Sequence, residues 1–367
     1  MFIQSLELSD YRNYEHLNID FSENINILYG DNAQGKTNLL EAIYLCATTK
    51  SYRGSRDKEI IRFDSNESHI KMMLDRQGSL YRIDMHLKKY KNKGIAVNSI
   101  PIRRASELFG IVNVIFFSPE DLQIIKNGPS ERRKFMDSEL CQLDKIYLNH
   151  YGNYVKTVSQ RNVLLKQICE GKSVYDSSMI DVYDSQLVNY GSKMIEIRGK
   201  FIARLNEIIQ DIHKNLTGGR EEIKVLYEPN VGIERFEEEL FIGRERDIRT
   251  CTTNTGPHRD DISFTVYSEG RKKIDIRTFG SQGQTRTAAL SLKMAEIELV
   301  KNHTGQSPVL LLDDVLSELD SKRQMQLLQS IQGIQTFITC TGLDEFVKNR
   351  FQMDRVFYVE NGKIIQQ

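Results

Sequence analysis

The sequence predicts an α/β domain that is formed from both ends of the chain and interrupted by a helical insertion. Three observations lead to this prediction. Strand-like segments fill the first 118 residues, a proline-free interval with helical spacing follows, and strand-like segments return after about residue 250. Strands combined with helices in one lobe are typical of the α/β class. We therefore expect an α/β lobe from residues 1–118 and 250–367, and a helical lobe from residues 119–249.

The N-terminal part of the chain alternates between apolar and polar residues. Residues 17–21 and 25–29 follow this pattern, and short strand-like pieces continue over 69–87 and 95–102. A period of two residues is that of a half-buried strand. The segment "IVNVIFF" (111–117) is apolar almost throughout and predicts a buried strand.

The middle of the chain has the spacing of helices. None of the six prolines lies between Pro129 and Pro229, and apolar residues recur every three or four positions over 183–208 and over 147–158. Such spacing without proline predicts amphipathic helices. Gly171 is expected to separate the two.

Composition restricts the class of protein. Charged residues make up 27% and hydrophobic ones 40% of the 367 residues, which is ordinary for soluble globular proteins. The apolar runs are too short to span a bilayer, and we expect no signal peptide and no membrane partner. The five cysteines are scattered and form no CxxC pair, so a disulfide framework or zinc site is not expected and a reducing cytoplasm is the expected location. Basic and acidic residues balance at 50 each, so any argument for nucleic acid needs a local patch.

A phosphate-binding loop follows the strand predicted over 25–29. The segment "YGDNAQGKTN" fits G-x-x-x-x-G-K-[ST] and stands between a predicted strand and a predicted helix, the context that supports such a match. Its backbone N–H groups would surround the phosphates of a nucleotide, Lys36 would supply charge to them, and Thr37 would bind Mg²⁺. The expected ATP-binding residues of this loop are Gly30, Asp31, Asn32, Ala33, Gln34, Gly35, Lys36, Thr37 and Asn38.

Two carboxylates end an apolar strand near the other end of the chain. After the alternating segment "ISFTVYS" (262–268), the segment "SPVLLLDDVLSELD" (307–320) reads as a buried strand followed by Asp313 and Asp314. Carboxyl ends of parallel strands are where α/β proteins bind ligands. We expect Asp313 to bind Mg²⁺ and Asp314 to orient or activate water against the γ-phosphate, with Asp314 and Lys36 as the catalytic residues. Alone, the pair would indicate only a solvated acidic turn.

These motifs and the segment "SQGQ" between them resemble the ABC-type ATPase heads of the SMC-like superfamily. Within it, the blocks "SDYRNYEHLNIDF" (9–21), "PEDLQIIKNGPSERRKFMD" (119–137) and "TGPHRDD" (255–261) resemble the RecF family of bacterial DNA recombination and repair proteins. The resemblance extends along nearly the whole chain. It implies an ABC-type ATPase head with a mixed sheet around the phosphate loop and an inserted helical lobe.

The resemblance also implies that two molecules face each other head to tail. Ser281, Gln282, Gly283 and Gln284 stand where the family has its signature loop, with Gln282 at a position where glycine is more usual. In this arrangement the signature loop of one subunit contacts the γ-phosphate bound by the other. Ser317 and Asp320 of "SELD" would form the D-loop near the dimer interface. The alternative is a plain helix N-cap by Ser281 or Thr285.

The sequence departs from the ABC pattern in ways that favour slow hydrolysis. Cys340 occupies the position of the switch histidine, and Asp314 is one methylene shorter than the usual glutamate. Where a glutamine-containing loop is expected, the chain has "SPED", in which Glu120 or Asp121 would substitute. The resemblance further implies that Arg12 and Asn13 approach the adenine and α-phosphate side of ATP. His258 is equally consistent with a structural role and with a place near the nucleotide or DNA.

A basic segment offers a place for DNA. Residues 88–104 contain six basic residues and no acidic one, and a hairpin with this balance would follow a phosphate backbone without reading sequence. A solvated charged face is the plainer alternative. The candidate DNA-binding residues are Lys88, Lys89, Lys91, Lys93, Arg103 and Arg104.

The resemblance thus implies an ATP-dependent DNA-binding protein. An ATP-induced homodimer would clamp double-stranded DNA, including its junctions with single strands, in recombinational repair and replication restart. A weak, DNA-stimulated ATPase would act as a switch that reopens it. The implied cofactors are ATP and Mg²⁺, and the implied protein partners are RecO and RecR, with loading of the RecA recombinase as the output. An ATPase subunit of a transporter-like ABC assembly, or a small-molecule kinase, remains an alternative.

Overall fold

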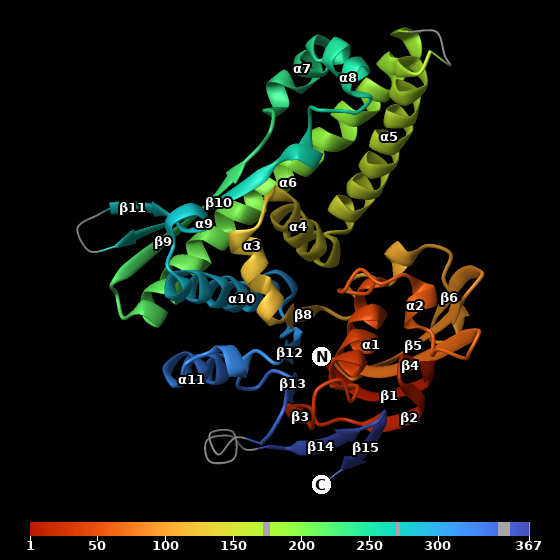
Figure 1. The fold of residues 1–367 in the computed structure, drawn as a ribbon, viewed down its shortest axis with the longest axis vertical. Coiled ribbons are helices and arrows are strands. Elements are labelled where there is room, and N and C mark those ends of the chain that lie inside the picture. Colours follow the sequence, from red (N-terminus) through yellow and green to blue (C-terminus); the bar gives the residue numbers. More distant parts are fainter. Residues whose placement is uncertain (172–176, 269–271, 344–352, 367) are drawn as a thin grey trace. The chain divides into compact units, whose positions relative to one another are not determined.

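The computed structural model describes residues 1–171, 177–268, 272–343 and 353–366. It divides into two compact units. The first unit contains residues 1–121 and 296–367, so both ends of the chain contribute to it, and the second contains residues 122–295. In Figure 1 the first unit accordingly combines the red and orange N-terminal elements with the blue C-terminal ones.

The first unit contains a largely parallel sheet with the strand order β15-β14-β3-β13-β12-β8 (Figure 1). Its neighbours are parallel except β14 and β15, which pair antiparallel. The central strand β3 comes from the N-terminal region and lies between two strands that follow it by more than 300 residues. The strands are β3 (Ile25–Tyr29), β8 (Val114–Phe117), β12 (Val309–Asp313), β13 (Thr336–Cys340), β14 (Arg355–Glu360) and β15 (Lys363–Gln366).

A second sheet of the first unit is antiparallel, with the order β2-β1-β4-β5-β6-β7. Its strands are joined mostly by short turns, and buried residues alternate with more exposed ones along β4 and β5. One face is therefore packed on the core and the other faces solvent. The strands are β1 (Phe2–Tyr11), β2 (Tyr14–Asp20), β4 (Glu67–Arg76), β5 (Ser79–Lys88), β6 (Lys91–Val97) and β7 (Ile100–Pro101).

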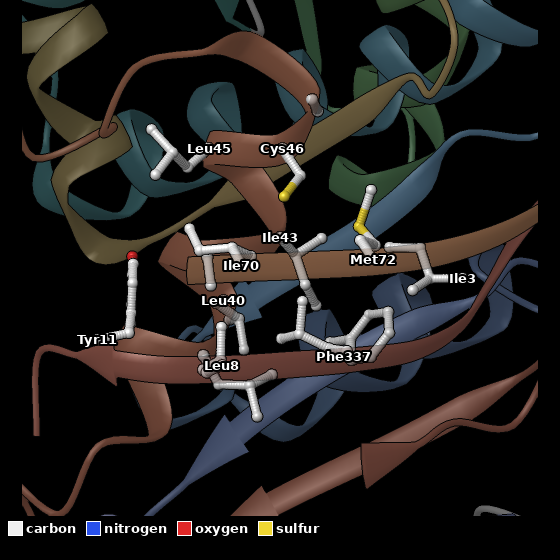
Figure 2. Packing of buried hydrophobic residues seen from close by; sticks show 14 of the residues in the cluster. Ile3, Leu8, Tyr11, Leu40, Ile43, Leu45, Cys46, Ile70, Met72 and Phe337 are labelled. Atoms are coloured by element: carbon white, nitrogen blue, oxygen red, sulfur yellow. The ribbon is translucent and has the colours of Figure 1, made fainter. Parts of the chain in front are cut away.

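Helix α1 (Lys36–Thr48) packs between these two sheets. Figure 2 shows its side chains Leu40, Ile43 and Cys46 among Ile70 and Met72 of β4 and neighbouring strand residues. All of these are at most 1% exposed, and burial of each such side chain stabilises the fold by about 1.5–3 kcal/mol. The start of α1 is thereby held at a fixed place between the sheets. Smaller elements of this unit are α2 (Asp57–Ile60) and α11 (Ser321–Ser330).

The second unit is mainly helical. Its longest helix, α6 (Ser177–Thr217), packs along α5 (Lys145–Cys169) and against the strand β9 (Glu221–Glu228). The apolar spacing of the sequence predicts both helices. The remaining helices and strands of this part are α3 (Leu122–Lys126), α4 (Pro129–Leu143), α7 (Phe236–Ile242), α8 (Arg244–Thr250), α9 (Ile276–Phe279), the first part of α10 (Gln282–Thr304), β9 (Glu221–Glu228), β10 (Asp261–Ser268) and β11 (Lys272–Asp275).

The observed division differs from the boundary expected near residue 250. Residues 250–295 belong to the second unit, because β10 pairs with β9 over its whole length and β11 extends the same sheet. The alternation in "ISFTVYS" indicated a half-buried strand, which β10 is, but alternation carries no information about the partner strand. The chain returns to the first unit at Glu296.

Charged side chains are unusually deep in the second unit. Arg161 is fully buried and pairs with Asp184 and Asp247, each at 2.7 Å. Arg198 is 1% exposed and pairs with Asp137 at 2.6 Å. Each guanidinium thus contacts more than one acceptor, which is the condition under which buried charges are tolerated.

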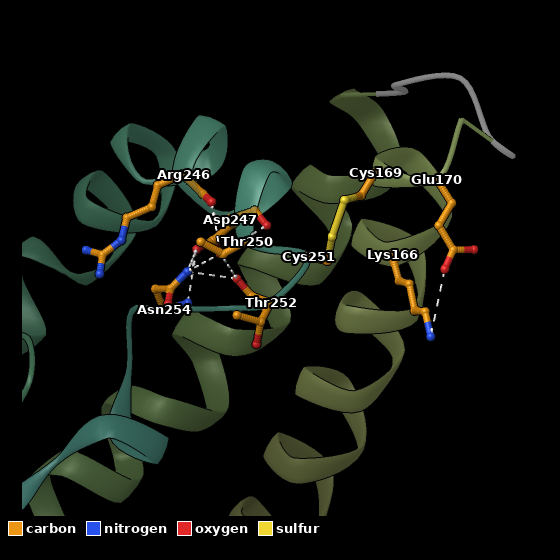
Figure 3. The surroundings of a disulfide bond; sticks show 9 residues. All are labelled: Lys166, Cys169, Glu170, Arg246, Asp247, Thr250, Cys251, Thr252 and Asn254. Atoms are coloured by element: carbon orange, nitrogen blue, oxygen red, sulfur yellow. Dashed lines mark hydrogen bonds and ion pairs between the residues drawn. A yellow bond between two sulfur atoms is a disulfide. The ribbon is translucent and has the colours of Figure 1, made fainter.

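A disulfide joins Cys169, at the end of α5, to Cys251, directly after α8 (Figure 3). The scattered cysteines predict no disulfide framework, and the structure differs from that expectation at this pair. The two residues are 82 positions apart, and only the packing of α8 against α5 brings their Cα atoms to 6.0 Å. Among the described residues, no helix is long and apolar enough to cross a membrane.

Candidate nucleotide site

The loop between β3 and α1 turns tightly at two glycines. Gly30 has φ 144° and Gly35 has φ 122°, values that L side chains rarely adopt. A Cβ on Gly30 would collide with the carbonyl oxygen of Val359, and one on Gly35 would lie 2.6 Å from Nδ2 of Asn13. The loop leads directly into the N-terminus of α1, whose free N–H groups and dipole favour an anion.

Lys36 lies at the floor of this loop and is 7% exposed. Its Nζ donates hydrogen bonds to the carbonyl oxygens of Gly30 and, at 2.7 Å, of Asp31. Burial lowers the pKa of its ammonium group, although the neighbouring carboxylates of Asp313 and Asp314 act in the opposite direction. The lysine is therefore placed where a phosphate group would complete its coordination.

Thr37 and Asp313 meet although 276 residues separate them. The Thr37 hydroxyl donates to Oδ1 of Asp313 at 2.8 Å, and the Thr339 hydroxyl donates to the same oxygen at 2.8 Å. The hydroxyl of Thr339 in turn accepts from the backbone N–H of Asp314 at 2.9 Å. Asp314 itself has a left-handed φ of 54°. A hydroxyl beside a carboxylate provides the hard oxygen donors that Mg²⁺ prefers.

One pocket of about 610 Å³, within the usual range for small-molecule sites, is lined by Lys36, Thr37, Asp313 and Asp314. The predicted residues Gly30 and Asp31 are not among its lining residues. It is formed by the phosphate loop, by the carboxyl ends of β8, β12 and β13, and by the segment after α1. Its lining residues are Asn32, Ala33, Gln34, Gly35, Lys36, Thr37, Asn38, Tyr52, Arg53, Ser118, Pro119, Glu120, Asp313, Asp314, Thr339 and Thr341.

Several lining residues were not anticipated from the sequence. Ser118 follows β8 and Thr339 is the last residue but one of β13, so the rule that ligands bind at the carboxyl ends of parallel strands could have found them. Tyr52 and Arg53 carry no such signal, because their position depends on how the segment after α1 folds back. The Tyr52 ring stacks on Phe116 with centroids 3.8 Å apart.

Two residues of the "SPED" segment take different positions. Glu120 lines the pocket, whereas the Asp121 carboxylate accepts a hydrogen bond from the backbone N–H of Ser118 at 2.7 Å. Cys340 ends β13 between the pocket residues Thr339 and Thr341.

Arg12 is bound to side chains beside the pocket and is not among its lining residues. Its guanidinium donates to both carboxylate oxygens of Glu41, at 2.9 and 2.8 Å, and to the hydroxyl of Ser55 at 2.8 Å. Burial alone would lower the pKa of Arg12, but the hydrogen bond and charge of Glu41 raise it. Glu41 also accepts from Ser51 at 2.5 Å. This network ties the segment that contains Tyr52 and Arg53 to helix α1.

Asn13 contacts the phosphate loop directly. Its Nδ2 donates to the carbonyl of Gln34 at 2.7 Å, and its Oδ1 accepts from Nδ2 of Asn38 at 2.9 Å. The hydroxyl of Tyr14 donates to the carbonyl of Gly35 at 3.0 Å. Asn13, between β1 and β2, and Tyr14, at the start of β2, therefore fix the end of the loop that leads into α1.

The residues of the predicted signature lie in the second unit, at the start of α10. Ser281 and Gln284 form a reciprocal cap, since the Ser281 hydroxyl accepts from the N–H of Gln284 at 3.2 Å and Oε1 of Gln284 accepts from the N–H of Ser281 at 3.0 Å. Gln282 and Gly283 form the exposed first turn. The plain helix cap is thus present at Ser281, and it is compatible with a contact to an anion.

The D-loop candidates are in the first unit, close to Asp314. Ser317 donates its hydroxyl to the carbonyl of Asp314 at 2.7 Å. Asp320 is the N-cap of α11, where it accepts from the N–H of Arg323 at 2.9 Å and also pairs with the Arg323 guanidinium. The hydrogen bond from that N–H is the main reason why the pKa of Asp320 is lowered.

The basic segment forms the hairpin β5–β6 followed by β7, and its charges are not equally available. Lys93 is held by Asp57 at 2.9 Å and by the carbonyl of Thr49. Lys88 lies 3.8 Å from Glu67, and Lys89 donates to the carbonyl of Phe63 at 3.3 Å. The remaining candidates are exposed: Lys91, Arg103 and Arg104.

His258 is enclosed in the second unit. Its Nδ1 accepts from the hydroxyl of Tyr154 at 2.7 Å, and its Nε2 donates to the carbonyl of Thr253 at 2.9 Å, an assignment that follows from these partners. Burial lowers its pKa to about 4, so the ring is neutral at pH 7.

Comparison with known proteins agrees with this geometry. Residues 2–365 match the family model described as RecF/RecN/SMC N terminal domain. A DNA replication and repair protein RecF from Lachnoclostridium phytofermentans is 58% identical over 364 residues, which is 99% of both chains, and one from Lachnospira eligens is 57% identical over the full length of both. The chain belongs to the RecF family. A solved structure of the recombination mediator RecF with ATP, in the RecFOR pathway, matches with a TM-score of 0.90 at 33% identity, covering 100% of this chain and 97% of that one.

A solved structure of much lower sequence identity shares the fold. The Smc head domain of Pyrococcus furiosus, which is 15% identical, matches with a TM-score of 0.58 over 100% of this chain and 96% of that one, and this likeness concerns the fold alone. The ABC-type ATPase head predicted from the sequence is thereby confirmed.

Proposed function

We propose that this RecF-family chain is an ATP-dependent DNA-binding protein of recombinational repair, in which ATP closes a head-to-tail dimer. The observation that carries the proposal is the convergence of Lys36, Thr37, Asp313 and Asp314 in one pocket. The phosphate loop accepts the phosphates through its N–H groups and Lys36. Full-length similarity to RecF relatives favours this function over a transporter-like ATPase.

Thr37 and Asp313 would hold Mg²⁺ through their side-chain oxygens. Their two oxygens are already 2.8 Å apart, and both are hard donors. Mg²⁺ would neutralise charge on the β- and γ-phosphates when bound. Thr339, which also donates to Asp313, orients the carboxylate from the neighbouring strand.

Asp314 orients the water that attacks the γ-phosphate of ATP, which yields ADP and phosphate. Its backbone is fixed by the hydrogen bond from its N–H to Thr339 and by the one its carbonyl accepts from Ser317. Because its side chain is one methylene shorter than glutamate, we infer that hydrolysis is slow. Stimulation of this hydrolysis by DNA is proposed from the similarity to RecF relatives. ATP then acts mainly as a switch.

The signature loop of one molecule contacts the γ-phosphate held by Lys36 of the other. Support comes from the first turn of α10, where Gln282 and Gly283 are exposed and the cap of Ser281 leaves backbone N–H groups at the helix end. Ser317 and Asp320 then lie near the dimer interface. ATP binds at two such sites in the dimer. It favours the dimer to the extent that its affinity for the dimer exceeds its affinity for the monomer.

Double-stranded DNA, including its junctions with single strands, binds through the basic hairpin. Lys91, Arg103 and Arg104 are exposed there and contact phosphates, while Lys93 positions the strand through Asp57. The second unit carries further dimer, DNA or partner surfaces. Since the solved RecF relatives act in the RecFOR pathway, RecO and RecR are the proposed partners.

Sedimentation equilibrium tests the proposal. The mass is measured without nucleotide, with ADP and with a non-hydrolysable ATP analogue, for wild type and for Ser281→Arg. We expect dimers only for wild type with the analogue. Ser79→Arg, which adds the same charge at the exposed first residue of β5, is the control and should dimerise normally. A monomeric wild type with the analogue, or normal dimers of Ser281→Arg, contradicts the head-to-tail contact.

Retention of duplex DNA on filters tests the coupling to ATP. Lys36→Met should abolish the retention that depends on ATP, because it removes the charge that the phosphates require. Retention equal to that of wild type would contradict a role of ATP in DNA binding.

A further inference from the structure

Three potential metal ligands gather on the solvent face of the antiparallel sheet. Strand alternation directs Glu67 and His69 of β4 to this face, while Ser68 and Ile70 between and after them are buried. His86 of β5 is the direct cross-strand partner of His69. The two imidazole rings stack with centroids 3.9 Å apart and planes inclined by 24°.

Their donor atoms are close enough to share one ion. Nε2 of His86 lies 2.9 Å from Oε2 of Glu67, and one ligand atom from each of Glu67, His69 and His86 lies within 4.8 Å of the others. Ligands about 2.0 Å from a tetrahedral ion are about 3.3 Å from each other. Small changes of side-chain rotamer therefore convert the present cluster into a coordination sphere.

Small residues on the neighbouring strand β6 leave room beside the cluster. Gly94 is the cross-strand partner of His86, and Ala96 is that of Asp84, so the neighbouring strand β6 contributes little side-chain volume here. A hollow of about 400 Å³ results, lined on its other sides by Glu7, Lys71 and further strand residues.

We propose that Glu67, His69 and His86 form a binding site for a divalent transition metal ion, with Zn²⁺ as the best fit. Two imidazoles and one carboxylate are a common donor set for zinc with an open fourth position, which here faces the hollow and takes water. None of the three residues lines the nucleotide pocket, so the site does not depend on the proposed ATP function.

Lys88 supplies a test of the electrostatics. Its Nζ lies 3.8 Å from Oε2 of Glu67 and competes with a cation for that carboxylate. Lys88→Gln should therefore tighten metal binding, whereas loss of any of the three ligands should weaken it.

Calorimetric titration of Zn²⁺ into the full-length, chelator-treated protein without nucleotide tests the site. We expect one equivalent to bind, and His69→Ala and His86→Ala to weaken it by at least the roughly 10–100-fold that second-shell changes cost. Glu67→Gln, an exposed substitution that leaves the fold intact, should also weaken binding. His303→Gln, in α10, is the control for removal of a histidine outside the cluster and should bind as wild type does.

Co²⁺ provides a readout of geometry. A four-coordinate site with two imidazoles should give the protein a visible absorption band that is lost in His86→Ala and kept in His303→Gln. The proposal is overturned if wild type binds no Zn²⁺, or if its stoichiometry and affinity are unchanged in His86→Ala and Glu67→Gln.

Discussion

Removal of the Glu41 carboxylate should destabilise the first unit strongly. The Glu41 side chain is 0% exposed, and that of Arg12 is 19% exposed. Glu41 accepts two hydrogen bonds from Arg12 and one from Ser51. Glu41→Ala leaves a partly buried guanidinium and a buried hydroxyl without this acceptor.

The expected cost follows from these contacts. Removal of one partner of a buried ion pair costs about 3–5 kcal/mol, mainly because the other charge remains desolvated. Arg12 retains its hydrogen bonds to Ser55 and to the carbonyl of Glu59, so we expect a value near the lower end of this range. Arg12→Ala in the Glu41→Ala background should then cost less than Arg12→Ala alone, by at least the roughly 1.5 kcal/mol of one charged hydrogen bond.

Urea unfolding of wild type, Glu41→Ala, Arg12→Ala and the double variant measures both the cost of Glu41→Ala and its coupling to Arg12→Ala. Glu15→Ala is the matched control, because Glu15 pairs with Arg62 at 3.2 Å but the two side chains are 68% and 40% exposed. An exposed pair of this kind contributes about 0–1 kcal/mol. If Glu41→Ala costs no more than Glu15→Ala, or if the two changes of the cycle are additive, the network does not stabilise the wall of the pocket as we infer.

Three further predictions concern other parts of the chain. Asp314→Asn should lower the kcat of ATP hydrolysis by about 10²–10⁴-fold and leave ATP affinity within a few-fold, measured by phosphate release and by titration of a fluorescent analogue; unchanged kcat would remove Asp314 from the reaction. His258 has a folded-state pKa of about 4, below its ordinary 6.5, so the unfolded chain binds protons better and stability falls as the pH drops from 6.5 towards 4. The free energies of unfolding at pH 7 and pH 5 should therefore differ by about 2 kcal/mol more in wild type than in His258→Gln, and equal differences would contradict the neutral ring. Reduction of the Cys169–Cys251 disulfide, which spans 82 residues, should lower the unfolding free energy of the second unit by about 4.5 kcal/mol in urea, and dithiothreitol should have no such effect on Cys251→Ser.

The residues of the nucleotide pocket were those most readily predicted from the sequence. A phosphate loop fixes its residues at a set spacing, and the buried strand β12 ends at Asp313, so each half could be recognised locally. Their meeting at the Thr37–Asp313 hydrogen bond follows from the rule for carboxyl ends of parallel strands. The helices α5 and α6 were predicted as readily, because their apolar spacing is sustained over many turns.

Features that depend on tertiary partners could not be predicted in this way. In the sequence, nothing distinguishes Glu41 from the other polar residues of a helix. Only the packing of α1 between two sheets buries it. The same limitation applies to β10, whose alternation is satisfied by any partner strand, and to Cys169 and Cys251. Arg12 was assigned to ATP from resemblance, while its observed contacts are with Glu41, Ser55 and Glu59.

The interleaving of the two chain ends in one sheet has a consequence for biosynthesis. Residues 122–295 are contiguous, and the ribosome completes them before it reaches β12. The 276 residues between Thr37 and Asp313 take roughly 14–55 s to translate at 5–20 residues per second. During that interval the phosphate loop lacks its carboxylate partner and the strands on both sides of β3. A nascent chain therefore cannot assemble the pocket until the strands on both sides of β3 have been synthesised.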